Sequence, residues 1–80
     1  MAMVQDNEIS LELSADEALV LFAWLARFNI KNEEAEFEDA AEQRVLGSLE
    51  TRLERVLVAP FKANYSELLA DARNRVRGVA

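Results

Sequence analysis

The chain has 80 residues, of which 51% are hydrophobic, and carries a net charge of −6 at pH 7. It contains no Cys and no His, which excludes disulfides, thiolate zinc sites and Cys nucleophiles, and removes the commonest metal ligand and neutral-pH general base. A core this small gives modest stability, so good helix packing and self-association are the reinforcements that remain.

The N-terminal segment combines a tail with a short alternating pattern. Residues 1–8 are predicted to be a flexible tail. Apolar and polar residues then alternate with the period of a strand, which places Ile9, Leu11 and Leu13 on one side. A single strand cannot satisfy its own backbone groups. We therefore expect this segment either to pair with a symmetry-related strand in a dimer or to lie as an extended arm on the helices.

The next segment predicts a first helix, from about Ala15 to about Asn29. Ser14 and Glu17 have the spacing of a capping box. Apolar residues occupy nearly every direction around this helix, so it must be covered from more than one side. We expect a partner chain to cover the part that includes Trp24. The candidate interface residues on this helix are Leu19, Val20, Ala23 and Trp24.

A second helix is predicted from about Ala40 to about Ala59, with Asp39 as its cap. Its inward stripe has three-four spacing and comprises Val45, Leu46, Leu49, Leu53, Val56 and Leu57. One flank is acidic through Glu50 and Glu54, and the other is basic. In an antiparallel dimer the acidic flank of one such helix would face the basic flank of its mate.

After Pro60, a third helix is predicted from about Tyr65 to about Arg77, with Asn64 and Glu67 as a further capping box. Phe61 and Tyr65 are expected to anchor the turn. An Asp71–Arg75 pair at four-residue spacing and Gly78 as the residue that ends the helix complete the element; the inward residues are Leu68, Leu69, Ala72 and Val76.

These elements predict a mainly α fold, a three-helix bundle-like domain over residues 9–78 with one short N-terminal strand or extended arm, and a dimer. The longest apolar run, residues 18–26, is too short to span a bilayer. Residues 1–13 carry acids and no basic residue, which differs from a signal peptide, so we expect a cytoplasmic location.

Several stretches resemble a family of short uncharacterised bacterial proteins. The resemblance is carried by Asp16 to Asn29, Ala41 to Glu50, Ala59-Pro-Phe61 and Tyr65 to Arg73. It implies a bacterial, cytosolic origin. It implies no activity, cofactor or site.

No constellation of residues predicts catalysis or a resident cofactor. The chain has no Gly-rich phosphate loop and no recognisable nucleophile with a general base, so we expect a non-enzymatic protein without metal or cofactor. Arg73, Arg75 and Arg77 lie on different sides of one helix and lack an aromatic platform, which argues against nucleic-acid binding.

The charge is divided between the halves of the chain. Residues 1–42 hold eleven acidic against two basic residues, a net −9, whereas residues 43–80 hold four against seven, a net +3. The densest acidic cluster comprises Glu33, Glu34, Glu36, Glu38, Asp39 and Glu42. It can be a solvated connection, or a surface that docks on a basic protein as an inhibitor, an antitoxin or a mimic of nucleic acid.

The sequence thus supports two hypotheses. The first is a self-associating protein–protein interaction module, most simply a homodimer that uses the strand-like segment and the first helix. The alternative is an acidic protein that docks on a basic target through Glu33, Glu34 and Glu36.

Overall fold

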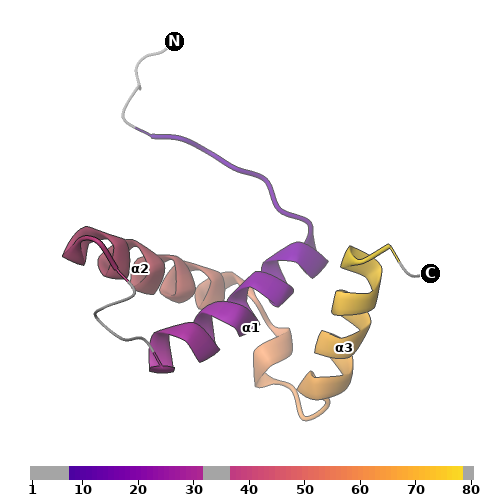
Figure 1. The fold of residues 1–80 in the computed structure, drawn as a ribbon. Helices are drawn as coiled ribbons and strands as arrows, with labels where there is room; N and C mark the ends of the chain where they lie inside the picture. Colours follow the sequence, from indigo (N-terminus) through magenta and orange to yellow (C-terminus); the bar gives the residue numbers. More distant parts are fainter. Residues whose placement is uncertain (1–7, 32–36, 79–80) are drawn as a thin grey trace.

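The computed structural model describes residues 8–31 and 37–78. Its helices are α1 (Ala15–Lys31), α2 (Ala40–Val56) and α3 (Tyr65–Val76), and a short 3-10 helix, η2 (Ala59–Phe61), precedes α3. α1 packs against α2 on one side and against α3 on the other, whereas α2 and α3 have few contacts with each other (Figure 1). The predicted mainly helical fold is confirmed, with α1 as the central helix of a small bundle.

The capping box predicted at the start of α1 is confirmed. The backbone N–H of Glu17 donates to Oγ of Ser14 at 3.0 Å, and the backbone N–H of Ser14 donates to Oε1 of Glu17 at 2.9 Å. Together they satisfy two backbone donors that a helix start would otherwise leave free. α1 ends at Lys31, two residues beyond the expected Asn29.

The contact between α1 and α2 is built from leucines around one buried cluster. Leu25 is fully buried, and Ala18, Phe22 and Leu53 are buried beside it. The partly buried residues packed on this cluster are Leu21, Leu46, Leu49 and Leu57. The three-four spacing of the second helix therefore placed most of its inward stripe correctly.

A polar side chain also joins α1 to α2. The amide of Asn29 donates to Oε1 of Glu50 at 2.7 Å and reaches the carbonyl oxygen of Leu46 at 3.5 Å. Glu50 is half-buried by this contact. The acidic flank of α2 is thus used in part within the chain, which removes Glu50 from the acid-to-base pairing between two copies of α2 that the sequence suggested.

The contact between α1 and α3 is built from smaller side chains and an ion pair. Leu19 and Ala23 of α1 and Ala72 of α3 are buried. At its outer end the guanidinium of Arg75 donates two hydrogen bonds to the carboxylate of Asp16, at 2.7 and 3.0 Å. The sequence predicted that Arg75 would pair with Asp71 along α3. Arg75 instead bonds across to Asp16 of α1.

The boundaries of the last two helices differ from the expected ones at specific residues. α2 ends at Val56 because Leu57 is extended, with φ −95° and ψ 138°. Asn64 has φ −99° and ψ 32° and its side chain makes no capping hydrogen bond, so the capping box predicted at Asn64 is wrong. Gly78 has φ 81°, the left-handed conformation expected of the residue that ends a helix.

Residues 8–14 form an arm that leaves the start of α1 and runs away from the helices (Figure 1). Ile9 is 93% exposed and Leu11 is 86% exposed. The arm contains no strand, and the expectation that it lies on the helices of its own chain is wrong. Pairing with a second chain stays a prediction, since one chain cannot display it.

Candidate interaction surface

An apolar surface runs along the side of the α1–α2 contact. It contains Trp24, which is 44% exposed, and Val45, which is 63% exposed, although both are large hydrophobic side chains. We call it the Trp24–Val45 face. Its members are Trp24, Phe28, Phe37, Ala41, Val45 and Leu49.

Three aromatic rings form one end of this face. Trp24 stacks on Phe28, one turn later in α1, with ring centroids 4.8 Å apart and planes at 14°. Phe37, just before α2, meets Phe28 edge-on at 5.8 Å. Both distances lie in the range of favourable aromatic pairs. Through this contact Phe37 packs the segment just before α2 against the C-terminal part of α1.

Two shallow grooves continue the face along α2. The first, of about 490 Å³, is lined by Phe28, Phe37, Ala41, Glu42, Val45 and Leu46. The second, of about 380 Å³, is lined by Ala41, Arg44, Val45, Ser48, Leu49 and Arg52. Ala41 and Val45 line both grooves. The second has an apolar floor and a rim with two arginines.

The structure divides the predicted interface residues of α1 into two pairs. Leu19 is 6% exposed and Ala23 is 5% exposed. Both face the side of α1 that α3 covers, so they are not available to a partner, and this part of the prediction is wrong. Trp24 is exposed and Val20 is partly exposed. These two remain candidates for a contact with another protein.

The sequence also misplaced other apolar residues, inside and outside this face. Val45 and Val56 were expected inside, but Val56 is 73% exposed. Phe61, expected to anchor a turn, is 69% exposed. Both valines lie at the edge of the inward stripe of α2, where covering them needs a second neighbouring helix. Since α3 packs on α1 instead, the periodicity alone could not reveal their exposure.

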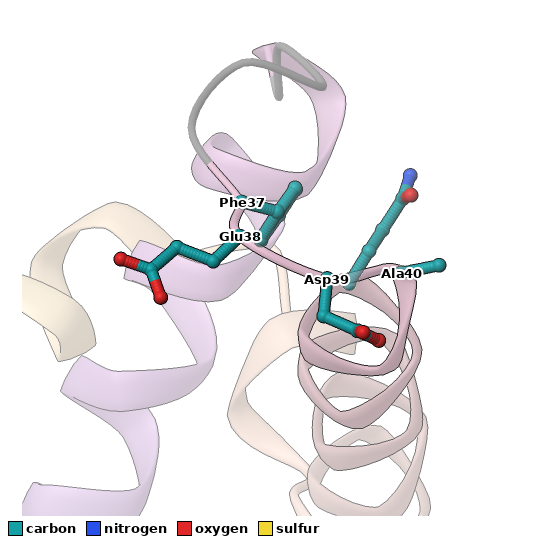
Figure 2. A pocket seen from close by; sticks show the side chains of 5 residues that line it. Phe37, Glu38, Asp39 and Ala40 are labelled. Atoms are coloured by element: carbon teal, nitrogen blue, oxygen red, sulfur yellow. The ribbon is translucent and has the colours of Figure 1, made fainter.

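The acidic connection is described only in part. Glu33, Glu34 and Glu36 lie outside the described residues. Asp39 caps α2 by accepting a hydrogen bond from the backbone N–H of Ala41 at 2.7 Å. Figure 2 shows that the side chain of Glu38 points away from that of Asp39.

Glu42 completes this local arrangement by accepting the backbone N–H of Glu38 at 2.9 Å. The described acids therefore support the start of α2, where negative charge suits the helix dipole. Docking of the connection on a basic protein stays a prediction.

The described residues form no cluster suited to holding a metal ion. No three acidic side chains among residues 8–31 and 37–78 lie close enough together to hold a metal ion. The hydrogen bonds from Arg75, followed by its charge, lower the pKa of Asp16, and the same contact raises the pKa of Arg75. This pair joins α1 to α3 and lies apart from the Trp24–Val45 face.

In the part of the chain that the structure describes, no helix has the length and hydrophobicity needed to cross a membrane. A scan with protein-family models, a search of curated proteins and a search of solved structures each found no match to this chain. The resemblance to short bacterial proteins therefore stays a prediction.

Proposed function

We propose that this protein is a non-enzymatic interaction module that forms a homodimer through the Trp24–Val45 face. The observation that carries the proposal is the exposure of Val45 and Trp24 on a continuous apolar surface beside the core. Contiguous apolar patches are uncommon on monomeric proteins and mark sites of association. Aromatic residues, Trp above all, dominate the energy of such contacts.

A second copy is the simplest partner because the second groove of the face combines an apolar floor with basic charges. Arg44 and Arg52 border the floor, whereas the chain as a whole is acidic. In a twofold contact each copy offers the same patch together with its own acidic segments. Burial of Trp24 and Val45 against such a partner would supply the stability that a small core lacks.

The test is the mass of the wild-type chain and of V45E in solution, measured by light scattering at micromolar concentration. The wild-type chain should have twice the 9.0 kDa mass of one copy. V45E should be monomeric, because a carboxylate cannot be buried in an apolar contact without a partner, and should keep its helical circular dichroism.

T51E serves as the matched control, because it adds the same charge on an exposed part of α2 that lines neither groove. It should remain dimeric. A wild-type chain that is monomeric over the whole concentration range would refute the proposal.

A further inference from the structure

The arm and the second groove of α2 have complementary patterns. In the arm, apolar residues at 9, 11 and 13 alternate with Glu8, Ser10 and Glu12. In the groove, an apolar row of Ala41, Val45 and Leu49 runs beside a polar row of Arg44, Ser48 and Arg52. An acid–serine–acid series can therefore meet an arginine–serine–arginine series.

The spacings of the two patterns also agree. Alternate residues of an extended chain recur about every 6.8 Å, and residues four apart on a helix recur about every 6 Å. Over three positions the mismatch stays near 2 Å, on the order of what flexible Glu and Arg side chains can absorb. The arm thus has the length and the order of residues needed to lie along the groove.

We propose that residues 8–13 of the arm of each copy lie in the second groove, on α2 of the other copy. This inference rests on the proposed homodimer and names the segments that form it. The arm of the structure turns away from its own helices and leaves Ile9 and Leu11 exposed. The capping box ties the backbone of Ser14 to Glu17, which fixes the point where the arm leaves α1.

Arm exchange explains several features with one contact. It covers the apolar residues of the arm and Val45 at once, and it places acidic Glu8 and Glu12 beside the basic rim. Exchange of an identical element between two copies closes a twofold dimer. It requires no strand pairing, since the arm binds by its side chains to a helix.

The first experiment exchanges charges and measures the dimer dissociation constant by sedimentation. R44E/R52E leaves an acidic arm facing an acidic rim, and E8R/E12R leaves a basic arm facing a basic rim. Each variant alone should dimerise at least about tenfold more weakly than the wild-type chain. An equimolar mixture of the two should regain most of the affinity, because both contacts of the mixed dimer then join opposite charges.

The matched control is K62E/R77E, which changes the net charge as R44E/R52E does but lies outside the groove. It should dimerise like the wild-type chain. If the wild-type chain is dimeric and the charge variants dimerise equally well alone, the dimer stands and arm exchange is wrong. If the wild-type chain is monomeric, the proposed homodimer itself fails.

The second experiment tests proximity directly, and the absence of native cysteines makes it clean. S10C chains labelled with ¹⁵N are mixed with unlabelled S48C chains and oxidised, and mass spectrometry measures the mixed disulfide. A disulfide requires Cα atoms within about 7 Å. Mixed product should form with S48C and not with the control E54C, on the opposite flank of α2. Equal yields with both, or closure of a disulfide inside one S10C/S48C chain, would overturn the proposal.

Discussion

The two sides of α1 are closed in different ways. Toward α2, large leucines surround the fully buried Leu25, and the apolar surface continues outward to the exposed Val45. Toward α3, the buried residues include the alanines Ala23 and Ala72, and an ion pair closes the outer end. The apolar surface of the α1–α2 contact thus continues into residues that the chain leaves exposed. The α1–α3 contact instead ends at the ion pair between Asp16 and Arg75.

This difference shows how one helix can be apolar nearly all round without needing a partner on every side. On the side of α3, Leu19 and Ala23 are covered within the chain. The leucines between α1 and α2 pack these two helices together but leave Val45, at the edge of α2, uncovered. A search for partners should therefore begin at the α2 side of α1.

The largest expected effect comes from truncating the centre of the α1–α2 contact. L25A removes a fully buried side chain and leaves a cavity, which costs about 3 kcal/mol in free energy of unfolding. In a domain this small, such a loss leaves a substantial unfolded fraction. Urea denaturation followed by circular dichroism measures it. V45A, at the exposed edge, should cost below about 0.5 kcal/mol in the monomer; equal costs would remove the distinction between centre and edge.

The next effect tests whether small residues are required between α1 and α3. A72L inserts three carbon atoms at a fully buried position, where overpacking costs about 1–3 kcal/mol. The same urea denaturation measures the change. A70L, on the exposed side of α3, is the control and should be nearly neutral. A stable A72L protein would mean that α3 can move away from α1 easily, and that its packing is looser than the burial of Ala72 indicates.

Local rules predicted much of the fold because their causes lie within a few residues. The capping box at Ser14 is correct, since its partners are three positions apart. The leucine stripe of α2 is largely correct, since its period is that of the helix. The capping box predicted at Asn64 is wrong because the backbone of Asn64 is not extended, and the sequence motif cannot specify that backbone conformation.

The candidate surface depended on relations that local rules cannot supply. Arg75 forms its hydrogen bonds with Asp16, which is 59 residues away in the sequence, and not with Asp71 on its own helix. Whether Leu19 or Val45 is exposed depends on which side of α1 receives α3. Periodicity identifies the apolar sides of a helix, but it does not say which neighbour covers each one.

A smaller effect is expected at the start of α1. S14A removes the acceptor for the backbone N–H of Glu17, a cap that contributes about 1 kcal/mol. The first turn also holds Asp16, so its fraying should weaken the α1–α3 side more than the α2 side. Amide hydrogen exchange should therefore quicken more in the last turn of α3 than around Leu53. S10A, in the exposed arm, is the control, and a uniform change across both sides would contradict the expected asymmetry.

The smallest effect concerns the ion pair that closes the α3 side. Hydrogen bonds from Arg75 hold the pKa of Asp16 below its ordinary value, so the folded protein favours the ionised carboxylate more than the unfolded chain does. This contribution is fully present above the unfolded pKa of about 3.9 and is lost as the pH falls through the lower folded pKa. D16N should thus lower the melting temperature slightly at neutral pH, since both side chains are partly exposed and such pairs contribute little.

The comparison of wild-type and D16N melting temperatures over a range of pH separates this pair from other acidic groups. The difference should be constant near neutral pH, shrink below about pH 4 and vanish in stronger acid, because the carboxylate of the wild-type chain is then protonated as well. D71N supplies the control for the pairing that the structure does not show, and its difference from wild type should be smaller. A larger effect of D71N would place the partner of Arg75 on α3 and leave the α1–α3 contact without its closing charge pair.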